Sequence, residues 1–163
     1  MTVFLCGFMG CGKSTTGKIL AKNLGLSYID SDEFIVEQEG MTIPEIFEKK
    51  GEPYFRKVEA EVIKSLCGKN AVVSCGGGAM LNSDTAAYAR ENGCVVFMDV
   101  PFESCYERIK GDANRPIVIN STPEELKQLY FKRYPIYRQN ATIKAECLST
   151  PLNSAEIIKN LLS

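Results

Sequence analysis

The residues best suited to chemistry form one run near the N-terminus, residues 7–14, which fits the phosphate-loop pattern G-x-x-x-x-G-K-[ST]. Its glycines let backbone N–H groups turn inward and bind phosphate oxygens, together with the positive end of the following helix. Lys13 is placed to reach the β- and γ-phosphates, and the Ser14 hydroxyl to bind Mg²⁺. A glycine-rich turn before a lysine is the alternative. A buried strand expected at 2–6 and a following helix closed by Gly25 argue against it.

The nucleotide-binding residues expected from this loop are Gly10, Cys11, Gly12, Lys13, Ser14 and Thr15. Cys11 lies at the start of the helix, where the dipole and Lys13 could lower its pKa, but a small residue filling the loop is the favoured interpretation. The other six cysteines include no C-x-x-C pair, so we expect reduced thiols.

Two carboxylates follow the next expected strand, residues 26–29. Asp30 and Asp32 open a helix that ends near Gly40, and helix capping alone would explain them. In open α/β sheets, however, ligands bind at the carboxyl ends of strands. We therefore expect one carboxylate to face Mg²⁺ and the other the acceptor. The chain has no histidine, so a carboxylate must accept the proton. Asp32 is that candidate, with its ionised form favoured by the helix dipole.

Two arginines occupy unusual positions. Arg56 lies in the first turn of a helix expected from about Pro53, where the dipole disfavours a cation. A salt bridge with Glu52 or Glu59 is one explanation. Arg133 falls on the apolar face of another expected helix, where it needs either a buried acid or a ligand, and we favour the ligand.

Two glycine-rich or polar stretches complete the candidate site. Gly76-Gly77-Gly78 follow the expected strand 71–75, where successive glycines let the backbone approach a ligand closely. The polar, breaker-rich stretch around Arg115 predicts a mobile lid over about 110–122, with a solvated linker as the alternative.

The elements that must position these residues alternate along the chain. Besides the three strands already given, we expect strands at 94–98 and 141–145, each connected through helices. This alternation predicts one α/β domain with a five-stranded parallel sheet covered by helices on both faces. Capping boxes are predicted at Thr42 and Thr122, and Asn153 or Ser154 is predicted to cap the last helix.

Composition excludes several classes of function. The 163 residues carry a net charge of −1, so bulk electrostatics indicate no nucleic-acid or membrane-surface partner. No apolar run approaches the ~20 residues of a membrane span, and we expect a cytoplasmic protein. The lack of histidine also excludes Ser-His-Asp and Cys-His nucleophiles and the H-E-x-x-H zinc site.

The ordered set of motifs resembles the shikimate kinase family over nearly the whole chain. The matching pieces are residues 7–15, Asp30 and Asp32, Phe55-Arg56 with Glu59, Gly76-Gly77-Gly78, Arg115-Pro116, Lys132-Arg133 with Pro135, and Tyr137-Arg138. The resemblance implies ATP-dependent phosphorylation of the 3-hydroxyl of shikimate in aromatic amino-acid biosynthesis. It also implies a three-layer P-loop kinase fold like that of nucleoside monophosphate kinases, with strands ordered 2-3-1-4-5. The single domain would be a monomer with its substrate-binding region at about 31–62.

On the nucleotide side, the resemblance implies that Ser14 binds Mg²⁺ and that Asp30 lies close to the metal through water. Arg115 would come down from the lid onto the phosphates, and Arg108 would lie against the adenine. Family members often have a basic residue in the loop before the last helix, and residues 147–153 here depart from that pattern.

On the acceptor side, the resemblance implies that Asp32 holds the acceptor hydroxyls. Arg56, Arg133 and the backbone at Gly77 and Gly78 would surround the substrate, with both arginines facing its carboxylate. The implied catalytic residues are Lys13, Asp32 and Arg115.

Two other hypotheses remain open at this point. The arginine pair fits any small carboxylate or phosphate, so the chain could be a kinase for gluconate or a nucleoside monophosphate. A nucleotide-binding module without turnover is the alternative from a different class, and it predicts ATP binding without acceptor-dependent ADP release.

Overall fold

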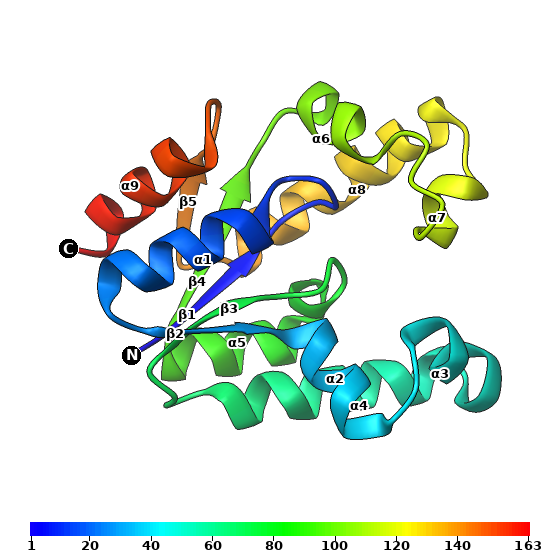
Figure 1. The fold of residues 1–163 in the computed structure, drawn as a ribbon, viewed down its shortest axis with the longest axis horizontal. Coiled ribbons are helices and arrows are strands. Elements are labelled where there is room, and N and C mark those ends of the chain that lie inside the picture. Colours follow the sequence, from blue (N-terminus) through cyan, green and yellow to red (C-terminus); the bar gives the residue numbers. More distant parts are fainter.

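The computed structural model describes residues 1–163 and contains one five-stranded parallel sheet (Figure 1). The strands are β1 (Thr2–Cys6), β2 (Ser27–Asp30), β3 (Ala71–Ser74), β4 (Cys94–Asp99) and β5 (Ile143–Glu146). Their order in the sheet is β2-β3-β1-β4-β5, and every neighbouring pair is parallel. The predicted fold class and strand order are therefore confirmed.

Helices cover both faces of the sheet, which makes three layers (Figure 1). They are α1 (Lys13–Leu24), α2 (Ser31–Glu39), α3 (Ile43–Lys50), α4 (Glu52–Leu66), α5 (Ser83–Asn92), α6 (Phe102–Ile109), α7 (Pro116–Ile119), α8 (Pro123–Asn140), α9 (Pro151–Leu162) and the 3₁₀ turn η1 (Ala79–Leu81). Helices α1 and α9 pack on one face, and α4, α5 and the C-terminal part of α8 pack on the other. None of these helices is both long and apolar enough to cross a membrane.

The central strand β1 shows why the sheet lies in the middle. All five of its residues are buried, as expected for a parallel strand covered on both faces. Successive side chains point to opposite faces, so Val3 and Leu5 join one hydrophobic cluster while Phe4 and Cys6 join the other. The sheet therefore separates two cores of similar size and holds the loop after β1 between them.

Most helix ends follow the sequence signals. Gly25 and Gly40 end α1 and α2 with φ of 67° each, a conformation that glycine adopts without strain. The predicted start of the last helix is wrong, because Thr150 is its cap and accepts a hydrogen bond from Asn153 N at 3.2 Å. Pro151 at the first helical position favours this earlier start.

The two predicted capping boxes differ. At α8, Thr122 and Glu125 form both reciprocal hydrogen bonds, which confirms the prediction. At α3, the Thr42 hydroxyl accepts from Glu45 N, but the Glu45 carboxylate accepts from that same hydroxyl at 3.1 Å. Only half of the second box is therefore formed.

The stretch between α6 and α8 contains the short helix α7, whose residues are half-buried or exposed. It lies at the same end of the molecule as α3 (Figure 1). Ile117 of α7 and Phe47 of α3 line a common cavity, so the stretch contributes to a site. That it moves as a lid remains a prediction.

Candidate active site

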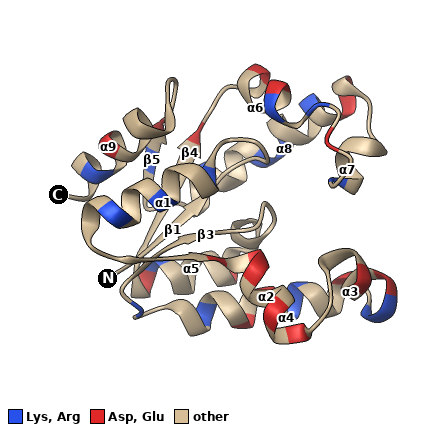
Figure 2. Ribbon diagram, in the orientation of Figure 1, with Lys and Arg blue, Asp and Glu red and all other residues tan.

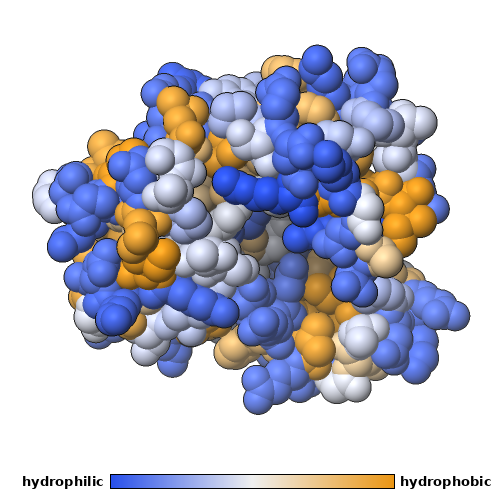
Figure 3. Space-filling model, turned by 45° about the horizontal axis from the view of Figure 1, so that its top comes forward, coloured by the Kyte–Doolittle hydropathy of each residue, from blue (hydrophilic) through white to orange (hydrophobic).

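Two adjoining cavities, of about 310 and 320 Å³, lie at the carboxyl edge of the sheet, where Figure 3 shows a recess. We call them the ATP-side and acceptor-side cavities. The loop after β1 lines the ATP-side cavity, and the acceptor-side cavity includes Arg56, Gly78 and Arg133. Residues that line both are Met9, Asp32, Gly76, Gly77 and Arg115. A group held in one cavity is thus within reach of the other.

The phosphate loop needs its glycines for two different reasons. Gly10 and Gly12 have φ of 80° and 92°, in the left-handed region that favours glycine. A Cβ on Gly10 would also lie 2.6 Å from the carbonyl oxygen of Cys105 on α6. The loop can therefore pack against α6 only with glycine at this position.

Lys13 is folded onto its own loop. Its Nζ donates to the carbonyl oxygens of Gly7 at 2.8 Å and Phe8 at 3.2 Å, and lies 3.6 Å from Cys11 Sγ. Cys11 itself is buried in the hydrophobic cluster that includes α1, which fits its interpretation as a small loop-filling residue. Ser74 of β3 was not predicted as a site residue, yet its hydroxyl donates to the Lys13 carbonyl at 2.9 Å.

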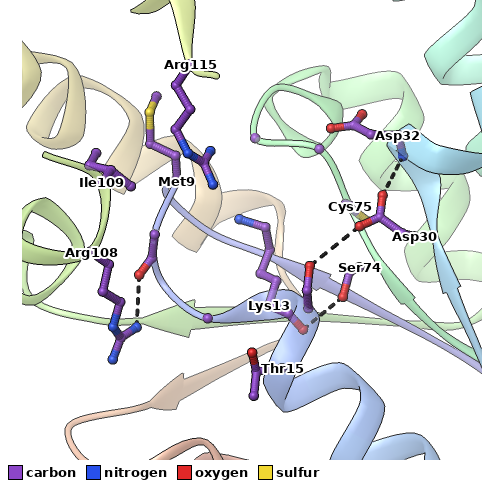
Figure 4. Close-up of a pocket in the computed structure, with 15 residues that line it drawn as sticks. Met9, Lys13, Thr15, Asp30, Asp32, Ser74, Cys75, Arg108, Ile109 and Arg115 are labelled. Carbon is purple, nitrogen blue, oxygen red and sulfur yellow. Dashed lines mark hydrogen bonds between the residues drawn. The ribbon is translucent and has the colours of Figure 1, made fainter. Parts of the chain in front are cut away.

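Asp30 has the capping role considered from the sequence, and its position is compatible with the proposed role toward Mg²⁺. Its Oδ1 caps α2 by accepting from Asp32 N at 2.9 Å and Glu33 N at 3.1 Å. Its Oδ2 lies 3.5 Å from the Ser14 hydroxyl (Figure 4). A hydroxyl and a carboxylate oxygen are the hard donors that Mg²⁺ prefers, so the residues present fit the metal.

One carboxylate oxygen of Asp32 is buried without a hydrogen-bond partner. This oxygen is Oδ1, and a Cβ on Gly76 would lie 2.5 Å from it. Burial raises the pKa of Asp32 and the charge of Asp30 adds to this, while Lys13, Arg56 and Arg115 oppose it. The net pKa is raised because desolvation outweighs the three cations, and the effect of the helix dipole stays a prediction.

The salt-bridge explanation for Arg56 is confirmed, and Arg56 also lines the acceptor-side cavity. Its Nη1 lies 2.9 Å from Glu59 Oε1, and its Nε lies 3.5 Å from Glu52 Oε1. A side chain on Gly78 would collide with the Arg56 guanidinium and force it to move. Gly76 and Gly78 thus make room for Asp32 and Arg56 in their present positions.

Glu59 was not among the predicted site residues, although it lines the acceptor-side cavity. It is only 4% exposed, and burial raises its pKa to about 7 while Arg56 opposes the rise. Figure 2 shows acidic residues on α2 and α4, and of these Asp32 and Glu59 line the cavity. The available signal was its position three residues after Arg56 on the buried stripe of α4.

Arg133 has no acidic partner and no hydrogen bond to the protein, so the buried-acid alternative is not found. It lines the acceptor-side cavity, and a Cβ on Gly77 would lie 3.5 Å from its Nη1. Two hydrogen bonds fix the position of helix α8 against the rest of the fold. Tyr137 donates to the Gly77 carbonyl, and Tyr130 donates to the Val100 carbonyl at 2.6 Å.

The two remaining predicted arginines lie at the ATP-side cavity. Arg108 of α6 donates through Nη1 to the Gly10 carbonyl at 2.9 Å (Figure 4). Arg115 extends from the stretch before α7 into the cavity, toward the Lys13 side chain (Figure 4). Residues 147–153, which cover the loop before α9 and the first residues of that helix, contain no basic side chain, and Leu148 and Leu152 are largely exposed, at 71% and 69%.

The fold and the site together define a class of protein. A parallel sheet in this order, a phosphate loop between β1 and α1, and a second cavity beside it that contains charged side chains are the features of a P-loop kinase that acts on small molecules.

Comparison with known proteins narrows this class to one family. The family model described as Shikimate kinase matches residues 9–163. A shikimate kinase of Persephonella marina is 46% identical over 138 residues, covering 84% of each chain, and that of Aquifex aeolicus is 42% identical over 163 residues, covering 99% of this chain and 94% of the relative.

Solved structures agree with the sequence comparison. The shikimate kinase of Acinetobacter baumannii in complex with shikimate superposes with a TM-score of 0.91 at 36% identity, covering 99% of this chain and 92% of that one. The crystal structure of the Aquifex aeolicus enzyme gives 0.88 at 41% identity, with 99% and 96% covered. The chain belongs to the shikimate kinase family.

Proposed function

We propose that this protein transfers the γ-phosphoryl group of ATP to the 3-hydroxyl of shikimate. The observation that carries the proposal is the wall shared by the two cavities, in which Asp32 and Arg115 border both. Family membership supports the same activity, as does the likeness to a structure described as a complex with shikimate.

The acceptor-side cavity offers groups of both signs to a hydroxy acid. Arg133 is without a partner, and Arg56 beside it faces the same cavity. We assign the substrate carboxylate to these two guanidinium groups. The partnerless Oδ1 of Asp32 then accepts a hydrogen bond from an acceptor hydroxyl, and the backbone at Gly77 and Gly78 borders the ring.

The ATP-side cavity neutralises phosphate charge. Backbone N–H groups of residues 10–15 and the N-terminus of α1 hold the phosphates, while Lys13 exchanges the carbonyls of Gly7 and Phe8 for the β- and γ-phosphate oxygens. Arg115 stabilises charge on the transferring group, and Arg108 lies on the adenine side. Ser14 and Asp30 would hold Mg²⁺, which when bound neutralises phosphate charge.

Asp32 is the proposed general base. Its raised pKa makes the carboxylate a better proton acceptor than an exposed aspartate would be. It takes the proton from the acceptor hydroxyl as the oxygen attacks the γ-phosphorus atom. Lys13 and Arg115 favour the ionised carboxylate before the reaction, because both lower its pKa.

We further propose that residues 31–62 form the substrate-binding region and that residues 110–122 act as a lid. Both segments contribute to the acceptor-side cavity, through Arg56 and Phe47 in the first and Ile117 in the second. We propose that the enzyme acts as a monomer, because the phosphate loop, Asp32 and Arg133 of one chain already line two adjoining cavities and the proposed reaction needs no second subunit.

The test is ADP release from ATP and Mg²⁺ with shikimate, gluconate or a nucleoside monophosphate as acceptor. We expect release with shikimate, and a product phosphorylated at the 3-hydroxyl by phosphorus NMR. Turnover with gluconate or a nucleotide and none with shikimate would refute the proposal. ATP binding without release for any acceptor would favour a non-catalytic nucleotide-binding module.

A further inference from the structure

The turn before α7 holds one arginine in an unusual way. The carboxylate of Asp112 is engaged at both oxygens, because Oδ1 accepts from Asn114 N at 2.9 Å and Oδ2 accepts from Arg115 Nε at 3.0 Å. The backbone N–H of Arg115 also donates to the Asp112 carbonyl at 3.3 Å. One acidic side chain thus shapes the turn and fixes the guanidinium.

The contact with Asp112 leaves the two terminal nitrogens of the Arg115 guanidinium group free. Only Nε is bonded, so neither terminal nitrogen has a partner in the protein. Arg115 lines both cavities, and its guanidinium points toward Lys13 (Figure 4). By contrast, Arg56 and Arg108 each use Nη1 for a contact within the protein. The two free terminal nitrogens of Arg115 suit the paired oxygens of a phosphoryl group.

The contribution of the Asp112–Arg115 ion pair to folding stability is too small to explain why the pair is present. The side chains of Asp112 and Arg115 are 32% and 44% exposed, and pairs this exposed contribute little to folding. What the pair does accomplish is to restrict a long, flexible side chain to one orientation before the ligand arrives. Electrostatic catalysis depends on such orientation, because the charge must already be in place when the transition state forms.

We propose that Asp112 is a positioning residue, which holds Arg115 by Nε so that both terminal nitrogens meet the phosphoryl group during transfer. The inference rests on the proposed function, since it assumes that Arg115 acts on that group. Asp112 itself touches neither cavity. Its effect should therefore fall on kcat and be absent when Arg115 is absent.

The selective variant is Asp112→Asn. The amide oxygen can still accept from Asn114 N, whereas the amide nitrogen that replaces Oδ2 cannot accept from Arg115 Nε. We expect kcat to fall roughly 10-fold, with the KM values for ATP and shikimate within about twofold of the wild type. The matched control is Glu107→Gln, which removes a nearby exposed ion pair with Lys110 (2.7 Å) and should leave kcat unchanged.

A double-mutant cycle with Arg115→Ala separates positioning from a structural role. We expect Asp112→Asn to have no further effect on kcat in the Arg115→Ala background. An equal loss of kcat in both backgrounds would mean that Asp112 acts through the turn alone and would overturn the inference.

Two further outcomes are decisive. A fully active Asp112→Asn variant beside an active wild type would overturn the inference and leave the proposed function intact. A wild type without shikimate-dependent ADP release would overturn both.

Discussion

The ATP-side and acceptor-side cavities have nearly the same volume but are built in opposite ways. Much of the ATP-side wall comes from one contiguous run, residues 9–15, at the start of α1. The acceptor-side wall combines α2, α3, α4, the loop after β3, the stretch at α7, and α8. The geometry of a contiguous motif depends mainly on its own residues. A pocket made from distant segments forms only when the sheet has folded and brought those segments together.

The two cavities also differ in how their charges are satisfied. On the ATP side, Lys13 already has carbonyl partners in its own loop, so it must exchange them for phosphates. On the acceptor side, Arg133 and Asp32 Oδ1 have no partner at all. A buried polar group without a partner is costly, and a bound hydroxy acid would remove that cost. Binding on the acceptor side therefore adds new contacts, whereas Lys13 on the ATP side must exchange existing ones.

The largest expected effect lies on the ATP side. Lys13→Ala should lower kcat by roughly 10³-fold, because it removes the one charged side chain of the phosphate loop from the transferring group. Steady-state ADP release measures the loss. Lys22→Ala, an exposed lysine on the same helix, is the control. Normal turnover by the Lys13→Ala protein would mean that the loop is not used for catalysis.

The substitution Asp32→Asn tests the role of a residue that lines both cavities. If Asp32 is the general base, kcat should fall by roughly 10²- to 10⁴-fold, with a smaller change in the KM for shikimate. Asp84→Asn, in the first turn of α5, controls for removing an acid from a helix N-terminus. A loss confined to KM would make Asp32 a binding group only.

A comparison of Arg133→Ala with Arg56→Ala sharpens the contrast within the acceptor side. Each loses a charged hydrogen bond to the substrate, so the KM for shikimate should rise roughly 10- to 100-fold. Only Arg56→Ala should also lower the melting temperature, because it leaves the buried Glu59 without its cation. Arg138→Ala, exposed on the same helix as Arg133, is the control. Destabilisation by Arg133→Ala without a KM effect would contradict the assignment.

The pH dependence of stability tests the acceptor side without any ligand. Burial raises the pKa of Glu59 from 4.5 to about 7, with Asp32 adding to the rise and Arg56 and Arg133 opposing it. The folded state thus holds a proton that the unfolded state releases between these values. The free energy of unfolding should fall as pH rises from 5 to 8, by up to about 3 kcal/mol more in the wild type than in Glu59→Gln.

Urea unfolding of both proteins at pH 5 and pH 8 measures this difference. Asp32 is present in both proteins, so its titration enters the comparison only through its coupling to Glu59. Equal pH dependence in the two proteins would show that Glu59 titrates like an exposed acid.

Local signals were enough to predict most of the fold. The strands at 2–6, 71–74 and 94–99 are strongly apolar, and turn glycines such as Gly25 and Gly40 mark where helices end. The start of the last helix was misplaced, because Asn153 and Ser154 are both good caps by residue type. Neither is the cap, because Pro151 prefers the first helical position and so places the cap at Thr150.

The amino-acid order alone predicts the phosphate loop, since its glycines, a lysine and a hydroxyl all lie within eight residues. Only the folded structure decides that Glu59 is buried against Arg56, that Asp32 keeps a partnerless oxygen with a raised pKa, and that Arg133 makes no salt bridge. The physical reason is desolvation. The cost of burying a charge depends on which distant elements pack around it, and that packing exists only when β2, β3 and β1 lie side by side.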